Sequence, residues 1–205
     1  IYHCDNGYLV NDPPVTNRLE TNIEVMAEFS SKAGLDSTLV LAPSTGYIAN
    51  DVLPNKHIVY HDDTLFKNTA DTLSKSNIAF VDVREDFKNA YNSGTQLYYK
   101  TDHHWTSEGA YLAYCAVSKE LQFTPNSKDD YEITSHDGFY GTTYSSSGFW
   151  FTKPDNIEIW ESKSLKSSDI EVSITDNGET TTSSSLFFLD NLNDDDKYPV
   201  YLDGN

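Results

Sequence analysis

The 205-residue chain has few basic residues, few cysteines and no long apolar run, and each shortage excludes a class of protein. Its 14 lysines and arginines stand against 32 aspartates and glutamates, a formal net charge of −18. Such a surface repels nucleic-acid phosphates, so we expect no nucleic-acid partner. No segment approaches the roughly 20 apolar residues that span a bilayer. Cys4 and Cys115 lack CxxC spacing, which argues against a zinc or thioredoxin-like site and predicts two free thiols.

Aromatic residues, by contrast, are plentiful: 14 tyrosines, 10 phenylalanines and 3 tryptophans. A disordered acidic chain lacks such groups because it has nothing to bury. The length is also enough for one domain with a sizeable core. The composition therefore predicts a folded, acidic domain.

Helical and strand-like patterns alternate through the first 120 residues. Apolar residues at helical spacing predict helices over residues 15–33, 62–76, 84–93 and 107–121. Continuous apolar runs predict buried strands over 38–42 and 78–81. The run 38–42 is apolar on both faces, which is typical of a central parallel strand. This order predicts an α/β fold with a mostly parallel sheet.

The composition changes after Pro125. Residues 126–205 are rich in Ser, Thr, Asp and Asn, with a β-like run over 157–160 and a hairpin turn at 176–178 between 169–175 and 179–185. A shorter hairpin is predicted within 1–14, turning at 5–7. We predict an α/β core over 1–125 and an irregular, β-rich extension of the same domain over 126–205. The acidic residues 194–196 are predicted to form a solvated loop rather than a calcium site.

The segment 97–106, just before the predicted helix 107–121, carries the most chemical information. Loops that follow parallel strands lie at the carboxyl edge of the sheet, where ligands bind. On extended backbone Asp102 and His104 share one face and His103 points to the other. A carboxylate beside an imidazole is the orienting pair of a hydrolase. A loop histidine with a helix cap from Asp102 or Thr106 explains the pattern as well.

Metal binding by Asp102, His103 and His104 is an alternative interpretation of the same residues. Ligands from adjacent positions are awkward, and His57, His61 and His136 show no ligand spacing that would complete a site. A manganese-dependent DHH phosphoesterase is disfavoured because no aspartate-rich motif follows the first strand. We therefore predict no metal and no other cofactor.

The run Tyr98–Thr106, with 109–111 and 113–114 behind it, resembles the signature of the bacterial DHHW family. That family is related to SGNH/GDSL hydrolases and to alginate O-acetyltransferases. Segments 5–9, 41–44, 139–149, 196–198 and 204–205 are similar to other parts of it. The resemblance implies an SGNH-like three-layer fold and an acyl-ester hydrolase or O-acetyltransferase of bacterial cell-surface or extracellular glycan. It implies Asp102 and His104 as catalytic residues, with His103, Trp105 and Tyr99 supporting the loop.

The nucleophile is the part of the family pattern that does not match. In the related acetyltransferases it follows the Asp-His pair, in an apolar strand that ends in Asp-Ser. Residues 106–205 contain no such strand, so we predict a fragment that lacks its nucleophile. Ser44 follows the strand 38–42, where ordinary SGNH enzymes place theirs, but Pro43 stands in place of Gly-Asp. A turn serine at 44 and a polar loop at 145–147 are the favoured interpretations.

Two further alternatives remain open at the level of the sequence. The aromatic residues at 139–140 and 149–151 could stack on a sugar, although packing against the sheet is favoured. The whole chain could also be a non-catalytic extracellular binding or scaffold module that keeps the loop for structural reasons. The feature that separates an enzyme from such a module is a serine hydroxyl within hydrogen-bond reach of His104.

Overall fold

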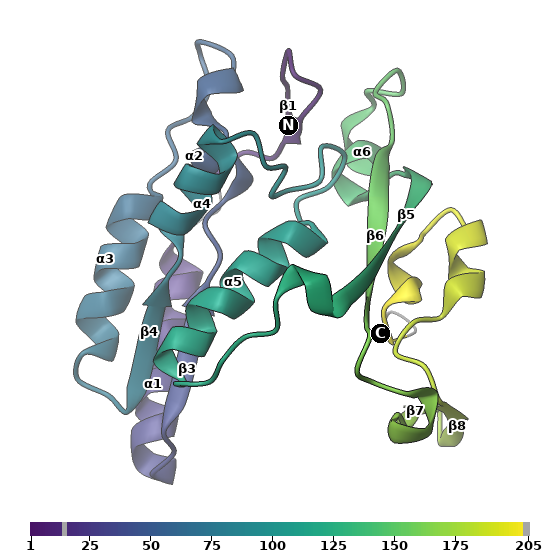
Figure 1. Cartoon of the computed structure of the whole chain (residues 1–205). Helices are drawn as coiled ribbons and strands as arrows, with labels where there is room; N and C mark the ends of the chain where they lie inside the picture. The colour runs from purple at the N-terminus through teal and green to yellow at the C-terminus, as the bar shows by residue number, and fades with distance from the viewer. Residues whose placement is uncertain (14–15, 203–205) are drawn as a thin grey trace.

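A computed structural model describes residues 1–13 and 16–202 (Figure 1). The helices are α1 (Thr16–Ala33), α2 (Thr45–Ile48), α3 (Asp62–Leu73), α4 (Arg84–Asn92), α5 (Ser107–Glu120) and α6 (Thr142–Ser147). The strands are β1 (Tyr2–His3), β2 (Leu9–Val10), β3 (Ser37–Leu41), β4 (Ile78–Asp82), β5 (Tyr131–Phe139), β6 (Asp155–Ser162), β7 (Val172–Asp176) and β8 (Glu179–Ser183). Short 3-10 turns are η1 (Asn50–Val52), η2 (Lys128–Asp130), η3 (Ser167–Asp169), η4 (Leu189–Asn193) and η5 (Tyr198–Val200).

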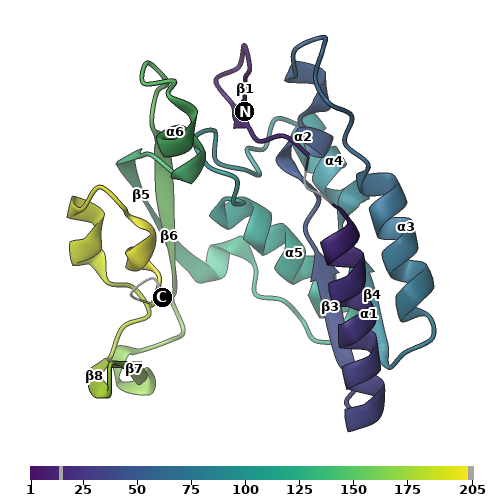
Figure 2. The ribbon, with the colours of Figure 1, turned by 180° about the vertical axis from the view of Figure 1, so that it is seen from behind.

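The parallel pair β3–β4 is the middle layer of the N-terminal part (Figures 1 and 2). Because side chains alternate across a strand, Leu39 and Phe80 pack with α1 and α3 on one face. Val40 and Val81 pack on the other face, with residues from α4 and α5. Helices therefore cover both faces, which is the layering expected of an α/β fold.

Most of the predicted elements are confirmed. The helices predicted over 15–33, 84–93 and 107–121 correspond to α1, α4 and α5, and α3 ends at Leu73, followed by a turn over 74–76. The hairpin around Asn177-Gly178 joins β7 and β8, and both turn residues have positive φ. The first hairpin pairs β1 with β2. The loop 194–196 is exposed, as predicted.

A mostly parallel sheet, however, is not confirmed. Within residues 1–13 and 16–202 the strands form four two-stranded sheets, and three of them are antiparallel: β1–β2, β5–β6 and β7–β8. Strand β3 pairs with β4 alone in this part of the chain, so the prediction of a central strand is not confirmed either. β7 and β8 follow each other through a two-residue turn, which allows only antiparallel pairing.

The C-terminal part has its own apolar cluster on the long ribbon β5–β6. Phe139, Ile157, Ile159 and Val200 are fully buried there, together with Tyr99 from the N-terminal part. This cluster brings η5 next to the loop that follows residue 99. In the described part of the chain, no helix is long and apolar enough to cross a membrane.

The two cysteines are free thiols, as predicted. Cys115 lies on α5 and is partly buried, whereas Cys4 is buried in the larger core cluster. Burial, with a smaller contribution from the Asp5 charge, raises the pKa of the Cys4 thiol to about 11. Cys4 therefore acts as a core residue rather than as a reactive thiolate.

Candidate active site

A buried carboxylate fixes the start of the loop that carries the Asp-His-His sequence. Asp155, the first residue of β6, accepts hydrogen bonds from the Lys100 amide (3.0 Å) and from the amide and hydroxyl of Thr101 (2.7 Å each). On the other side the Thr101 carbonyl accepts the Tyr144 amide of α6 at 2.9 Å. The loop is thus held between β6 and α6, which are both remote from it in sequence.

Asp102 is completely buried and receives four hydrogen bonds. His104 Nδ1 lies 2.6 Å from its Oδ2 atom, and the Tyr198 hydroxyl donates to the same oxygen at 2.5 Å. The amide and hydroxyl of Thr142 donate to Oδ1 at 3.1 and 2.7 Å. Burial alone would raise the pKa of Asp102, but the hydrogen bonds from Tyr198, His104 and Thr142 outweigh it and hold that pKa well below its ordinary value. The carboxylate is therefore ionised.

Tyr198 reaches this carboxylate from η5, 96 residues further along the chain. Burial, followed by the hydrogen bond to Asp102, raises the pKa of Tyr198 far above its ordinary value, so the phenol remains a donor. Its ring packs edge-on against Phe139 at 5.2 Å and against His104 at 5.0 Å. Tyr198 therefore positions both members of the Asp102–His104 pair.

Close approach of α6 to Asp102 depends on a glycine. A β-carbon at Gly141 would lie 2.2 Å from the β-carbon of Asp102 and 2.5 Å from its Cγ. Only a residue without a side chain leaves space for the carboxylate beneath the first turn of α6. The Thr142 donors reach Asp102 because of this approach.

The prediction that His103 points away from Asp102 is wrong. The rings of His103 and His104 lie 3.9 Å apart at an interplanar angle of 36°. His103 Nδ1 is 3.2 Å from Asp102 Oδ1 and 3.1 Å from the Thr142 hydroxyl. The prediction assumed extended backbone, whereas residues 101–104 form successive bends, and bends abolish the strict alternation of side chains.

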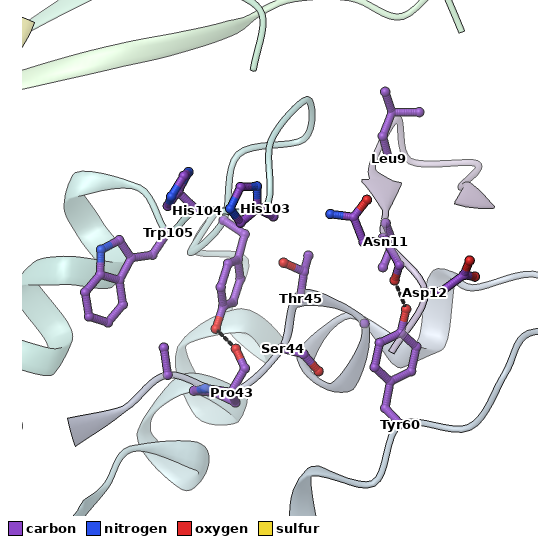
Figure 3. Close-up of a pocket in the computed structure, with 14 residues that line it drawn as sticks. Leu9, Asn11, Asp12, Pro43, Ser44, Thr45, Tyr60, His103, His104 and Trp105 are labelled. Carbon is purple, nitrogen blue, oxygen red and sulfur yellow. Dashed lines mark hydrogen bonds between the residues drawn. The ribbon is translucent and has the colours of Figure 1, made fainter. Parts of the chain in front are cut away.

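Both imidazoles line a cavity of about 470 Å³ (Figure 3). Pro43 and Ser44, which follow β3, line it as well, so the Asp102–His104 pair lies at the carboxyl end of that strand, as predicted. The His104 side chain is 50% exposed. Its Nε2 atom has no hydrogen-bond partner within the part of the chain that the structure describes. Figure 3 also shows the Asn11 amide on the opposite wall, directed toward the two imidazoles.

Ser44 lines the same cavity but does not approach His104 with its hydroxyl. The Ser44 hydroxyl donates to the Asp62 carboxylate at 2.9 and 3.0 Å, and the Ser44 amide donates to it at 2.7 Å. In Figure 3 the hydroxyl is directed away from the imidazoles. These contacts tie the start of α2 to the start of α3, which agrees with the favoured interpretation of a turn serine.

The other residues selected from the sequence surround the loop. Trp105 pairs with Tyr98 in an isolated bridge and packs near Phe87 at 6.4 Å. The buried Tyr99 ring contacts Phe139 at 4.8 Å, and its amide donates to the His104 carbonyl at 3.2 Å. The Thr106 hydroxyl caps α5 by accepting the Gly109 amide at 3.3 Å. A helix cap and an Asp-His pair therefore occur in the same loop.

Asp102, His103 and His104 also bring ligand-type atoms together. One atom from each lies within 4.8 Å of the others, close enough to share a cation. Both Nδ1 atoms already face the Asp102 carboxylate, so only the two Nε2 atoms remain directed outward. A structural zinc site needs about four protein ligands, one more than these three residues provide.

Three contributions to this site were missed from the sequence: Tyr198, Thr142 and Asp155. Tyr198 and Thr142 belong to segments that resemble the DHHW family, and this was the only signal that could have drawn attention to them. Their spacing from Asp102 carries no local pattern, because the contacts form only when β5, β6 and η5 pack together.

Comparison of the chain with known proteins identifies a matching family and several similar structures. Residues 4–136 match the family model described as the SGNH hydrolase-like domain of the acetyltransferase AlgX. No curated protein sequence matches the chain.

Several solved structures share the fold. Bacillus cereus PatB1, solved with a sulfonyl adduct, is 18% identical and superposes with a TM-score of 0.74 over 98% of this chain and 70% of that one. A DHHW family protein from Eubacterium siraeum is 25% identical, with a TM-score of 0.59 over 69% and 47% of the two chains. The O-acetyltransferase domain of Pseudomonas putida AlgJ is 16% identical, with a TM-score of 0.56 over 75% and 61%. The present chain thus spans about half to seven-tenths of the length of these relatives.

Proposed function

The chain belongs to the family of SGNH hydrolase-like domains represented by the acetyltransferase AlgX, and from this premise we propose that it transfers or hydrolyses acyl groups on the hydroxyls of a cell-surface or extracellular glycan. His104 is the general base and Asp102 its orienting carboxylate. AlgX is an acetyltransferase, and the AlgJ structure is that of an O-acetyltransferase domain. These two relatives support the acyl chemistry. A glycan substrate agrees with a location outside the cytoplasm or at the cell surface.

The observation that carries this proposal is the hydrogen bond between His104 Nδ1 and the buried Asp102 carboxylate at 2.6 Å. An ionised acceptor places the proton on Nδ1, which leaves the lone pair of Nε2 directed into the cavity. The same carboxylate stabilises the imidazolium that forms when Nε2 takes a proton. Charge-assisted hydrogen bonds of this kind are about twice as strong as neutral ones.

The proposed reaction follows from this orientation. Nε2 removes the proton of a hydroxyl while the hydroxyl oxygen attacks the acyl carbonyl carbon. The carbonyl double bond opens to an oxyanion. The Asn11 amide faces the imidazoles across the cavity and, with one N–H donated to the Thr143 hydroxyl, offers the other to this oxyanion. When the intermediate collapses, the imidazolium returns its proton to the leaving alkoxide, and the histidine is regenerated.

We propose that the nucleophilic hydroxyl comes from a serine that is not among the 205 residues of this chain. Ser44 is a poor candidate because its hydroxyl is engaged with Asp62 rather than with His104. Within residues 1–13 and 16–202, no serine hydroxyl forms a hydrogen bond to His104. The 205-residue chain alone is therefore expected to hydrolyse acetyl esters very slowly.

The experiment compares acetyl-ester hydrolysis by four proteins: this chain, the chain extended by the sequence that follows in its gene, and the extended chain with His104→Ala or His103→Ala. We expect activity in the extended chain, a loss of about 10²–10⁴-fold for His104→Ala, and a loss below tenfold for His103→Ala. Equal losses for the two variants would contradict the assignment of the base. An extended chain that stays inactive on a broad panel of acyl donors and glycans would favour a non-catalytic binding module.

A further inference from the structure

An exposed group of aromatic side chains follows α6. Trp150 is 80% exposed, the highest value among the large apolar side chains of the described residues, and Phe151 is 61% exposed. The half-buried Phe149 precedes them, and we call these three residues the aromatic rim. The favoured prediction from the sequence, that these rings pack against the sheet, is therefore wrong for Trp150 and Phe151. Packing holds for Phe139, which is fully buried.

Hydrogen bonds hold the backbone of the aromatic rim in a fixed turn. The Phe149 carbonyl accepts the amide (3.0 Å) and the hydroxyl (2.8 Å) of Thr152, which is itself buried. The Trp150 carbonyl accepts the Tyr144 hydroxyl at 3.3 Å. The ring of His3 lies 5.3 Å from both phenylalanine rings. Rings presented on a fixed turn can bind with little additional ordering cost.

The aromatic rim is attached to the wall of the cavity that contains His104. It follows α6, whose first residue donates two hydrogen bonds to Asp102. On the other side, His3 pairs with Leu9 of β2, which lines the cavity. Asn11, also a lining residue, donates to Thr143 of α6 at 3.4 Å. Figures 1 and 2 show α6 and the β1 hairpin at the same end of the molecule.

Charge narrows the class of ligand. The cavity is lined by one acidic residue, Asp12, and by no lysine or arginine, and the whole chain carries a net charge of −18. Lys153 is the one lysine or arginine within three sequence positions of the rim. An anionic membrane or a polyuronic acid would meet repulsion here. A neutral pyranose can place its C–H face on an aromatic ring, and an amino sugar adds a cation–π attraction.

We propose that the aromatic rim binds pyranose rings of a neutral or amino-sugar glycan and so positions the hydroxyls of that glycan near His104. The delivery of hydroxyls to His104 rests on the proposed function, whereas the binding does not. Trp150 and Phe151 provide the stacking faces, and the absence of cations from the described cavity lining selects against uronic acids.

Isothermal titration calorimetry on the full chain tests the binding without any catalytic step. The probes are hexasaccharides of glucose, of glucosamine and of a uronic acid, and the proteins are the unmodified chain, Trp150→Ala and the control Phe29→Ala. Phe29 is 64% exposed on α1, which lies at the other end of the molecule from α6 (Figures 1 and 2). We expect glucose or glucosamine hexamers to bind about tenfold more weakly to Trp150→Ala, which is typical of one lost aromatic contact, and unchanged binding to Phe29→Ala.

Three results would overturn the proposal: no binding of any probe, equal loss in both variants, or uronate binding at least as tight as that of the other probes. Dimerisation by light scattering that Trp150→Ala abolishes, without sugar binding, would assign the aromatic rim to a second copy of the chain instead. The variant His104→Ala should still bind the hexasaccharide. If it binds while the extended chain shows no acyl chemistry, the proposed function fails and the sugar site stands.

Discussion

Replacing Tyr198 by phenylalanine removes one hydrogen bond from the centre of the site and little else. The phenol donates to the buried, ionised Asp102 at 2.5 Å, and a hydrogen bond to a charged group contributes about 1.5–3 kcal/mol. The ring itself remains, with its edge-on contacts to Phe139 and Tyr99. We therefore expect Tyr198→Phe to lower the free energy of unfolding by about 2 kcal/mol at pH 7.

Tyr201→Phe is the matched control, because it removes a hydroxyl only three residues away. The Tyr201 hydroxyl donates to the neutral backbone carbonyl of Glu158 at 2.7 Å, and its other partners, the hydroxyls of Ser107 (3.5 Å) and Tyr99, are uncharged as well. Neutral hydrogen bonds contribute about 0.5–1.5 kcal/mol. The two variants should therefore differ in stability by about 1 kcal/mol at pH 7, with Tyr198→Phe the less stable.

The pH dependence separates the two variants further. Because the pKa of Asp102 is lower in the folded state, its stabilisation is present above the unfolded pKa of about 3.9 and is lost as the pH falls through the folded pKa. Without the Tyr198 donor the folded pKa is less depressed. Because Asp102 titrates alike in the two unfolded chains, the stability deficit of Tyr198→Phe should be constant from about pH 8 to 4 and narrow only well below the ordinary aspartate pKa of about 3.9, whereas that of Tyr201→Phe should not change.

Urea unfolding followed by tryptophan fluorescence at about pH 7, 5, 3 and 2 measures both effects. A Tyr198→Phe deficit no larger than that of Tyr201→Phe at pH 7 would refute the reasoning. A Tyr198→Phe deficit that is the same at pH 2 as at pH 7 would show that the bond does not depend on an ionised Asp102.

Two further substitutions test the surroundings of the site. Ser44→Ala should leave acyl transfer by the extended chain unchanged and lower the free energy of unfolding by about 1–2 kcal/mol, because the contacts with Asp62 are lost; an activity loss above tenfold would reinstate Ser44 as the nucleophile. Gly141→Ala should destabilise the chain by about 1–3 kcal/mol, because the added β-carbon would lie 2.2 Å from the β-carbon of Asp102. The same variant should also lower activity; an unchanged melting temperature would mean that α6 moves away freely.

Local sequence patterns determined the elements of this protein well. The helices α1, α4 and α5 follow from apolar residues at helical spacing, and the β7–β8 hairpin follows from an Asn-Gly pair whose residues adopt positive φ. These features depend on interactions between residues a few positions apart. The Asp102–His104 pair is local in the same sense, since its members are two residues apart and bond directly at 2.6 Å.

Other features were decided only by tertiary packing. Tyr198 and Thr142 complete the environment of Asp102 from 96 and 40 residues away, and Asp155 fixes the loop from 54 residues beyond Thr101. Neither the pairing of β3 with β4 alone, within the described residues, nor the exposure of Trp150 follows from the residues next to them.

The orientation of His103 shows the physical reason most clearly. Alternation along the sequence assigned it to the face opposite His104, yet both rings turn to the same carboxylate. The backbone bends there because hydrogen bonds from β6 and α6 hold Thr101 in place. The sequence by itself determined that an aspartate and two histidines stand together in one loop before α5, since a residue's type and its near neighbours are local properties. Only the tertiary structure decided how those residues face one another, because distant strands and helices supply the hydrogen bonds that bend the loop.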